Sequence, residues 1–343
     1  MSAHPCAARH VLITGGTGSF GERAIDRLLE AGVSRLTIYS RDEHKQFQLQ
    51  RRYERERRLR CLLGDVRDQA RLEEALAGVD IVIHAAAMKH VLACEANPAE
   101  AVLTNAMGTH SLIRACRRAE VSALINLSAD KACLPESVYG ATKLLSERIV
   151  TEAGVSNGSL LRGASVRYSN VLGSRGSVTS VYQELLRTGQ PLRVFDSRMT
   201  RLVLTQDQVV DLVFYALAHA VGGEVILKDA PALRIEDLAR AMVELHGSGE
   251  VIVSEQQAQA GEKYEASLLT ESEAERALLT PDGYYVIVPS LPAVDRARYA
   301  AGYPGAQVLD AKSRGSATAR LLNRGEVQEL LAEALRSSTA EMT

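Results

Sequence analysis

The sequence has little that would direct it to nucleic acid, to a membrane or out of the cell. Its 343 residues carry a formal net charge of −2, so no excess of positive charge favours nucleic acid or an anionic membrane surface. No apolar run reaches the roughly 18 residues that span a bilayer. The first ten residues, MSAHPCAARH, lack the apolar core of a signal peptide. We therefore expect a cytoplasmic protein without nucleic-acid or membrane partners.

Cysteine and histidine are present, but not in patterns that bind metal or form a disulfide framework. The five cysteines are odd in number and scattered, and no two form a CxxC pair. The eight histidines show no ligand spacing such as HExxH. The sequence therefore predicts no metal site. Cys133 lies near the catalytic motif described below, where a catalytic thiol is the alternative to a small buried side chain, and we favour the buried one.

The first half of the sequence alternates between strand-like and helix-like segments. Short apolar segments typical of strands lie at residues 10–14, 35–40, 59–65, 80–87 and 122–129. Segments typical of helices lie between them, at residues 20–32, 46–60, 70–79 and 98–121. This alternation predicts a parallel sheet covered by helices on both faces, and right-handed crossovers make such a sheet doubly wound. The predicted fold class is α/β, with a Rossmann-type sheet.

The regular alternation weakens after about Arg175. The later segments TSVYQELLRTGQPLRVFD and RIEDLARAMVELHG indicate helices and short strands instead. We therefore divide the chain into a Rossmann domain at residues 8–175, which binds a dinucleotide and carries the catalytic motif, and a smaller C-terminal lobe at residues 176–335. The lobe is expected to bind substrate, with some of its chain returning to the core.

A glycine-rich turn separates the first strand from the first helix. In VLITGGTGSFGERAIDRLL, Gly15, Gly18 and Gly21 have GxxGxxG spacing. Glycine allows a tight turn and lets backbone N–H groups approach a pyrophosphate, and the helix N-terminus adds partial positive charge. Because this turn opens a series of alternating strands and helices, the pattern predicts a dinucleotide site rather than a simple turn.

The end of the second strand indicates which dinucleotide binds. NAD sites usually carry Asp or Glu there, to accept a hydrogen bond from the ribose 2′-hydroxyl. This sequence instead has Ser40 and Arg41, with Lys45 a turn later, and cations at this point suit a 2′-phosphate. We therefore expect NADP, with NAD as the alternative because Asp42 follows directly.

A second motif follows the last strand of the series. Tyr139 and Lys143 form a YxxxK motif, and residues four apart share one face of a helix. The ammonium can lower the pKa of the phenol, so that tyrosinate takes a proton from a substrate hydroxyl as hydride leaves its carbon. Just upstream, Asp130 and Lys131 place an acid beside an amine. Hydride transfer alone does not require that pair.

The order of these motifs resembles a known family. The chain reads SADKA at residues 128–132 and PESVYGATK at residues 135–143. These stretches are similar to the STDKA…PxxxYGxTK signature of soluble, inverting-type UDP-N-acetylglucosamine 4,6-dehydratases in the extended short-chain dehydrogenase/reductase superfamily. Further stretches that resemble the family are TGGTGSFG, SRDEHKQ, GDVRD, AAAMKHVLACEANPAEAVLTNAMGT, RYSNVLGSRGSV, MTRLVLT and AGEKYEASLLT. The resemblance covers about residues 9–290.

The resemblance implies a lyase that removes water from UDP-N-acetylglucosamine (UDP-GlcNAc) and tightly binds NADP. Tyr139 would deprotonate the 4-hydroxyl as C4 loses hydride. Lys131 would then remove the C5 proton, Asp130 would protonate the departing 6-hydroxyl, and hydride would return to C6. Reprotonation from the opposite face would invert C5 of the 4-keto-6-deoxy product. One proton transfer from Lys131 to Asp130 would create both active forms at once. Family members are often dimers or hexamers, so a homo-oligomer is also implied.

The motifs and the resemblance together give the candidate site. Its catalytic residues are Asp130, Lys131, Tyr139 and Lys143. The residues expected to bind the cofactor are Gly15, Thr17, Gly18, Ser19, Phe20, Gly21, Ser40, Arg41, Lys45, Asp65, Val66, Ala85, Ala86, Lys89, Asn105, Tyr139 and Lys143. Substrate contacts are expected from Lys89, Ala129, Asn170, Arg175, Arg201 and Glu262. The guanidinium of Arg201 suits the diphosphate, and Glu262 with Lys263 is expected to close over the uridine or the ribose.

The chain departs from the family at several positions. Ala129 replaces the Thr that bonds the 4-hydroxyl in the family, and adjacent Ser128 is not expected to replace it, because neighbouring strand residues point to opposite faces. Ser169 replaces a Gly, and Glu265 and Ala266 replace a His-Glu pair. One lost hydrogen bond is worth roughly 1–3 kcal/mol, on the order of 10- to 100-fold in rate. The alternatives are therefore a variant UDP-sugar lyase such as a 5,6-dehydratase, an epimerase, or a catalytically dead dinucleotide-binding sensor.

Overall fold

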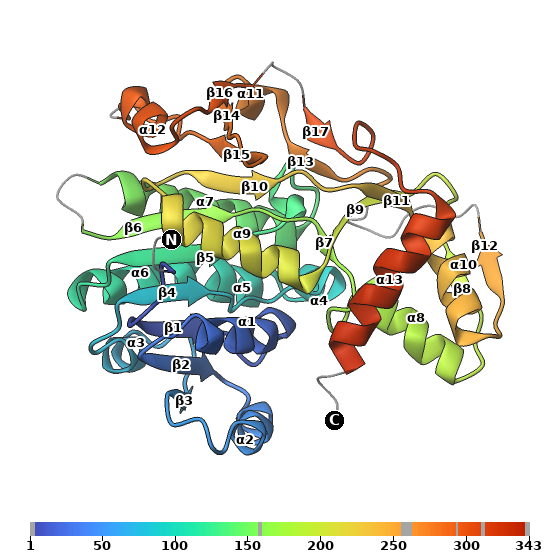
Figure 1. Cartoon of the computed structure of the whole chain (residues 1–343), viewed down its shortest axis with the longest axis horizontal. Coiled ribbons are helices and arrows are strands. Elements are labelled where there is room, and N and C mark those ends of the chain that lie inside the picture. Colours follow the sequence, from blue (N-terminus) through green and yellow to red (C-terminus); the bar gives the residue numbers. More distant parts are fainter. Residues whose placement is uncertain (1–3, 157–159, 255–262, 293, 310–312, 340–343) are drawn as a thin grey trace.

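One large sheet with helices on both faces forms the body of the protein, and a smaller lobe stands beside it (Figure 1). The computed structural model describes residues 4–156, 160–254, 263–292, 294–309 and 313–339. Glu262, one of the predicted substrate contacts, lies outside the described residues.

The main sheet has ten strands in the order β16-β14-β15-β10-β6-β5-β4-β1-β2-β3. Its parallel part consists of β1 (His10–Thr14), β2 (Arg35–Ser40), β3 (Leu59–Leu63), β4 (Ile81–His84), β5 (Ala123–Leu127), β6 (Arg162–Val166) and β10 (Val225–Lys228). An antiparallel extension consists of β15 (Tyr284–Ile287), β14 (Ala277–Leu279) and β16 (Gln307–Val308).

This strand order confirms the predicted doubly wound α/β fold. The sequence IVIH of β4 is buried throughout, as expected for a central parallel strand with helices on both faces. The order reverses at β1, whose neighbours are β2 on one side and β4 on the other. Open α/β sheets bind ligands outside the carboxyl ends of the strands at such a switch point.

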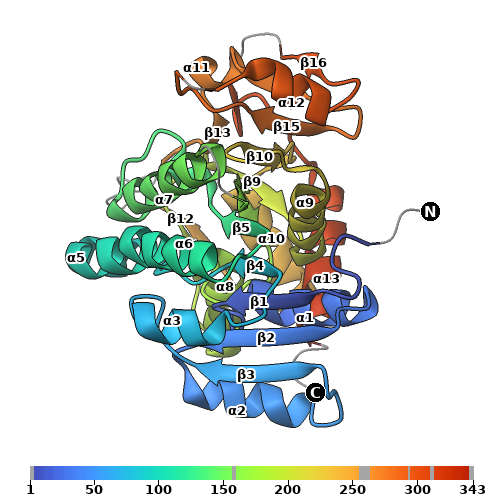
Figure 2. The same ribbon diagram turned by 90° about the vertical axis from the view of Figure 1, so that its left-hand side faces the viewer.

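Two helix layers cover the sheet, which Figure 2 shows between them. One layer contains α1 (Ser19–Glu30) and α9 (Gln206–His219), and the other contains α3 (Gln69–Ala75), α6 (Gly108–Arg118) and α7 (Val138–Val155). In the first layer, Ile25 and Leu28 of α1 share an apolar core with Val213 of α9. In the second, Leu112 of α6 and Val150 of α7 share another. α2 (Glu43–Arg52) packs beside β3.

The smaller lobe, on the right of Figure 1, has its own apolar core. Its elements are α8 (Val178–Arg187), β8 (Leu192–Val194), α10 (Ile235–His246), β12 (Val251–Val253) and α13 (Arg324–Thr339). Leu186, Leu238 and Leu331 bring α8, α10 and α13 together in that core. Between these elements the chain returns to the main sheet through α9 and β10. The division at residue 175 stays a prediction.

Short elements complete the fold. A three-stranded sheet contains β7 (Asn170–Val171), β9 (Thr200–Leu204) and β11 (Ala232–Arg234). The other elements are α4 (Val91–Ala96), α5 (Pro98–Ala101), the π-helix η1 (Val102–Met107), the 3-10 helix η2 (Asp130–Ala132), β13 (Ser267–Leu269), α11 (Glu271–Ala274), α12 (Arg296–Gly302) and β17 (Arg314–Gly315). Within the described part of the chain, no helix has the length and apolar character needed to cross a bilayer.

Two segments differ from the helices that the sequence predicts. A single helix over residues 46–60 is wrong, because α2 ends at Arg52 and β3 begins at Leu59. The Glu56 carboxylate accepts hydrogen bonds from the backbone N–H of Arg58 at 3.0 Å and from its guanidinium at 2.7 Å, and such local bonds compete with a helix. The predicted helix over residues 98–121 is interrupted by η1, and π-helical turns are frequent at functional sites.

Candidate active site

A cavity of about 1170 Å³ opens at the carboxyl ends of the parallel strands. The turn between β1 and α1 and the segments that follow β2, β4, β5 and β6 line it on one side. Residues of α8, β8, β9 and the start of α10 line it on the other. Sites for one small molecule usually enclose roughly 300–1,000 Å³, so this cavity is larger than a single such site requires.

The glycine turn is packed so tightly that side chains would not fit. Gly15 has a φ of 67°, and a Cβ there would lie 2.7 Å from the backbone of Ala86. A Cβ on Gly21 would lie 2.2 Å from the carbonyl oxygen of Gly16. Gly18 caps α1 without any side-chain hydrogen bond, so the helix N-terminus keeps backbone donors directed at the cavity side. This arrangement fits the pyrophosphate of a dinucleotide, as the sequence predicts.

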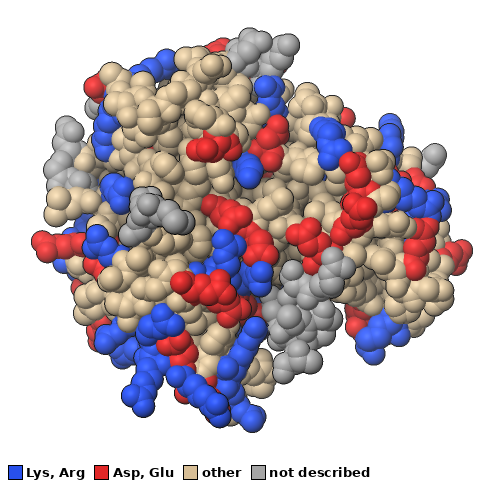
Figure 3. Space-filling model, viewed as in Figure 1, with Lys and Arg blue, Asp and Glu red and all other residues tan. Residues whose placement is uncertain are grey.

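The cations predicted to select NADP are paired with carboxylates. Lys45 Nζ lies 3.0 Å from Asp42, and Arg41 lies 3.4 Å from Asp65. The hydroxyl of Ser40 accepts a bond of 3.0 Å from the buried amide of Gln46, a contact that the sequence did not reveal. Figure 3 shows Lys and Arg side chains gathered at the lower edge of the molecule, over α2, among acidic ones. The surface around α2 is therefore rich in cations, but carboxylates neutralise Arg41 and Lys45.

The YxxxK pair lies on the first turns of α7, which Ser137 caps by accepting a hydrogen bond from the backbone of Gly140. Tyr139 lines the cavity, and burial raises the pKa of its phenol well above the usual value. Burial lowers the pKa of Lys143 to about 8. Lys143 donates a hydrogen bond of 2.5 Å to the carbonyl of Leu127. The sequence predicts that Lys143 lowers the pKa of the Tyr139 phenol, but without a bound cofactor that pKa is raised.

Asp130 and Lys131 lie in η2, directly after the segment that follows β5. Their side chains are 3.3 Å apart, with Asp130 6% and Lys131 32% exposed. The backbone N–H of Asp130 donates to the carbonyl of Tyr168 at 2.8 Å, which ties η2 to the end of β6. Asp130, Lys131 and Tyr139 all line the same cavity, beside Ala129. An acid, an amine and a phenol can therefore reach one bound molecule.

Most of the predicted site residues line this cavity. They are Gly15, Thr17, Gly18, Ser19, Phe20, Ser40, Arg41, Lys45, Val66, Ala85, Ala86, Lys89, Ala129, Asp130, Lys131, Tyr139, Asn170 and Arg201. The predicted residues that lie elsewhere are Gly21, Asp65, Asn105, Lys143 and Arg175. Asn105 supports the cavity wall from η1, because its side chain accepts from the N–H of Met88 at 2.7 Å and donates to its carbonyl at 3.0 Å.

Arg175 binds the glycine turn and does not line the cavity. Its guanidinium donates to the carbonyl of Thr17 at 2.6 Å and pairs with Glu22 at 2.9 Å. Its backbone N–H donates to the hydroxyl of Ser19 at 2.9 Å, and its carbonyl accepts from Lys89. Hydrogen bonds thus connect the loop after β7 directly to the glycine turn.

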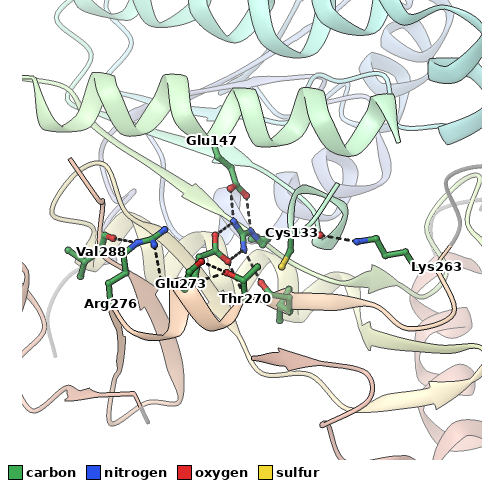
Figure 4. A network of polar contacts seen from close by, with 10 residues as sticks. Cys133, Glu147, Lys263, Thr270, Glu273, Arg276 and Val288 are labelled. Carbon is green, nitrogen blue, oxygen red and sulfur yellow. Dashed lines mark hydrogen bonds and ion pairs between the residues drawn. The ribbon is translucent and has the colours of Figure 1, made fainter. Parts of the chain in front are cut away.

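Two basic residues come from segments far along the chain. Arg201 on β9 is 9% exposed, lines the cavity, and donates to the carbonyls of Thr200 at 2.9 Å and Tyr264 at 3.3 Å. Lys263, expected beside the uridine, donates to the carbonyl of Cys133 at 3.2 Å and to that of Leu134 (Figure 4). Lys263 therefore fastens the loop after η2, close to the acid–amine pair.

A buried ion cluster next to the site was not predicted from the sequence. Arg167 is fully buried and binds Glu147 of α7 at 2.8 and 3.0 Å and Glu273 of α11 at 2.9 Å. Figure 4 shows Glu147 directed from its helix toward Glu273 and the neighbouring strand. Glu147 lies one turn after Lys143, and its negative charge favours the ammonium form of that lysine. The only sequence signal was this i, i+4 spacing.

The alternative of a catalytic thiol does not fit the structure. Cys133 is buried, and burial raises the pKa of its thiol to about 12. The thiolate is the nucleophilic form of cysteine, and at neutral pH this side chain is a thiol. Cys133 is therefore a small packed side chain, as favoured from the sequence.

The doubly wound sheet, the glycine turn and the YxxxK helix define a short-chain dehydrogenase/reductase of the extended type, with a second lobe across the cavity. Within that class, the chain belongs to the family described as polysaccharide biosynthesis protein, whose model matches residues 11–288. It is 39% identical to the UDP-N-acetylglucosamine 4,6-dehydratase (inverting) of Campylobacter jejuni over 291 residues, 84% of this chain and 85% of that protein. It is 34% identical to the UDP-glucose 4-epimerase of Rickettsia prowazekii over 327 residues, 94% of each chain. The structure of Pen from Bacillus thuringiensis matches with a TM-score of 0.88 and 34% identity, covering 96% of this chain and 98% of that one.

Proposed function

We propose that the protein is an NADP-dependent 4,6-dehydratase of UDP-N-acetylglucosamine that inverts C5. The observation that carries the proposal is the acid–amine pair, Asp130 and Lys131, 3.3 Å apart and in the same cavity as Tyr139. Moving hydride on and off one alcohol requires a single acid–base group. Eliminating water requires in addition a base at the carbon and an acid at the departing oxygen. The name of the Campylobacter relative supports the same reaction.

Each of the three groups has a step that its chemistry suits. Tyr139 as phenolate removes the proton of the 4-hydroxyl while C4 loses hydride. Lys131 as amine removes the C5 proton, which the new C4 ketone makes acidic. Asp130 as carboxylic acid gives its proton to O6, so that C6–O6 breaks and water leaves. Return of hydride to C6 and of a proton to the opposite face of C5 completes the inverted 4-keto-6-deoxy sugar.

The proposed steps require particular protonation states of these groups. The separation of 3.3 Å between Lys131 and Asp130 allows one proton to pass from ammonium to carboxylate, which creates the active base and the active acid together. Burial holds Tyr139 as a neutral phenol in the protein alone, since it raises the pKa of that group well above its usual value. A bound oxidised nicotinamide supplies the hydride acceptor and a positive charge that favours the phenolate.

The choice of NADP rests on Arg41 and Lys45 at the edge of the cavity. Both side chains are exposed, at 55% and 45%, and each is paired with one carboxylate. Exposed ion pairs contribute about 0–1 kcal/mol, so a 2′-phosphate can replace the carboxylates as partner. Asp42, which caps α2 through the N–H of Lys45, keeps NAD as the alternative.

A UDP-sugar 4-epimerase is the second candidate. The Rickettsia relative bears that name, and Ala129 lacks the hydroxyl that the dehydratase resemblance places beside Tyr139. Epimerisation at C4 would use Tyr139 and leave Asp130 and Lys131 without a role. The acid–amine pair therefore favours the dehydratase.

Product analysis in D₂O separates the candidates. The enzyme, loaded with NADP, is incubated with UDP-N-acetylglucosamine and the products are followed by NMR. The dehydratase gives a C6 methyl group, deuterium at C5 and inverted C5 couplings. A C4 epimer with protium at C5 would identify an epimerase instead, and a 5,6-alkene would identify a variant lyase. Tight dinucleotide binding without turnover of any UDP-sugar would indicate a sensor. We also propose a homo-oligomer, a dimer or a hexamer, which light scattering tests.

A further inference from the structure

Several buried polar atoms around the cavity have no hydrogen-bond partner among the described residues. Those on residues that line the cavity belong to Thr104, Ser169, Asn170 and Gln206. Buried polar groups are almost always hydrogen-bonded, so each exception requires an explanation. A ligand in the cavity is the simplest partner, because the residues that carry these atoms line its wall. Ser169 is the one of these residues at which the sequence departs from the family it resembles, where a glycine is expected.

Ser169 lies on the segment that follows β6, next to the segment that carries Ala129. β5 and β6 pair in parallel, with Leu127 opposite Val166. Beyond the paired strands, the N–H of Asp130 donates to the carbonyl of Tyr168 at 2.8 Å. Ala129 precedes that donor, and Ser169 follows that acceptor. Ala129 and Ser169 are thus on neighbouring chain segments, and both residues line the cavity.

Position 129 is beside the phenol that starts the reaction. Ala129 packs in a small apolar cluster with Tyr139 and Cys94, and its side chain has no donor or acceptor. Position 129 therefore offers no hydrogen bond to a sugar hydroxyl bound next to Tyr139, so any such bond must come from another segment. Ser169, 4% exposed and unpartnered in the described chain, can supply it.

We propose that Ser169 holds the hexose hydroxyl that Tyr139 deprotonates, and so supplies from the segment after β6 the hydrogen bond that Ala129 cannot supply from the segment after β5. The two departures from the family, Ala129 in place of Thr and Ser169 in place of Gly, then form a coupled pair. Together they transfer one side-chain hydroxyl from the segment after β5 to the segment after β6. This inference rests on the proposed function, because it requires a nucleotide-linked hexose in the cavity. It assigns Ser169 a substrate-positioning role and accounts for its unpartnered oxygen.

The test is a double-mutant cycle at the two positions. Ser169→Ala, Ala129→Thr and the double variant are compared with wild type as full-length, NADP-loaded enzyme. Ser128→Ala is the matched control, because Ser128 also has a buried, unpartnered hydroxyl after β5 but does not line the cavity. Single-turnover C4 oxidation of UDP-N-acetylglucosamine gives the rate, and calorimetry gives affinities for UDP, for UDP-N-acetylglucosamine and for its 4-deoxy analogue. Thermal unfolding checks that each variant folds.

We expect Ser169→Ala to slow C4 oxidation on the order of 10- to 100-fold, the effect of one hydrogen bond. Its affinity for the full substrate should fall, while affinities for UDP and the 4-deoxy analogue should match wild type. Ala129→Thr should restore the rate in the Ser169→Ala background, a non-additive result that independent sites do not give. Ser128→Ala should behave as wild type.

Other outcomes overturn the inference. A Ser169→Ala enzyme with the wild-type rate, an equal loss of affinity for the 4-deoxy analogue, or no rescue by Ala129→Thr would each show that Ser169 does not hold this hydroxyl. In these cases wild type still turns over the substrate, so the proposed function stands. If wild type binds UDP-N-acetylglucosamine no better than UDP and does not oxidise it, the proposed function fails, and the inference fails with it.

Discussion

Replacing Arg167 with methionine tests how strongly the buried ion cluster stabilises the packing of α7, the helix that carries Tyr139 and Lys143. Arg167 is 0% exposed and binds Glu147 and Glu273, whose side chains are 1% and 8% exposed. Methionine would fill much of the space but would leave two buried carboxylates without the guanidinium that binds them both. Removing one partner of a buried ion pair costs about 3–5 kcal/mol. Because this cation serves two anions, we expect a loss at the upper end of that range, a large part of the roughly 5–15 kcal/mol that stabilises a typical protein.

Urea unfolding followed by far-ultraviolet circular dichroism measures this loss, which suits a chain without tryptophan. Arg187→Met is the matched control, because Arg187 also binds a glutamate, Glu184, but with both side chains exposed at 72% and 61%. That control should show no measurable change in the midpoint. If the two variants unfolded at the same urea concentration, the cluster would not stabilise the fold in the way argued here.

Three further predictions concern the chemistry, the cofactor and the pH dependence. Lys131→Ala should still oxidise C4 but should release no water, as product NMR would show; water loss at the wild-type rate would mean that another group is the base. Arg41→Ala should weaken NADP binding on the order of 10- to 100-fold, as expected for a lost charged hydrogen bond, while NAD affinity stays constant; equal weakening of both would contradict the 2′-phosphate role. Burial alone would raise the pKa of Glu273, but hydrogen bonds from Arg167 outweigh it and lower that pKa. This contribution to stability is therefore present above the unfolded pKa of about 4.3 and is lost as pH falls through the lower folded value, so Glu273→Gln should flatten the fall in unfolding free energy below about pH 5.

The parts of the fold that could be predicted are those written in local patterns. The apolar strands and the helices between them determine a parallel sheet, and Gly15 and Gly21 mark a turn in which no Cβ fits. The acid–amine pair and the YxxxK pair were also visible, because each lies within five residues of sequence. The predicted helix over residues 46–60 was wrong because a side chain there binds the backbone locally. Glu56 binds the backbone of Arg58 and ends the expected helix early.

The contacts that could not be predicted join residues far apart in sequence. Glu147, Arg167 and Glu273 meet only once α7, the segment after β6 and α11 are assembled, and no local spacing connects Glu273 to the other two. Gln46 reaches Ser40 because α2 folds back over the end of β2. Lys263 binds the carbonyl of Cys133, 130 residues away. Such contacts depend on packing geometry, which the sequence pattern does not express.

The reach of the acid–amine pair depends on where one strand ends. Side chains of adjacent strand residues point to opposite faces, so Asp130 and Lys131 could not both reach a sugar if β5 continued through them. β5 ends at Leu127, and a 3-10 turn over residues 130–132 lets both side chains line the cavity. That turn is fastened on one side by the bond from Asp130 to Tyr168 and, just beyond it, by Lys263. The sequence predicted a strand over residues 122–129, one that reaches the residue before the pair. A strand that continued through Asp130 and Lys131 would place one charged side chain on each face of the sheet, so the early end of β5 is what allows both side chains to line the cavity.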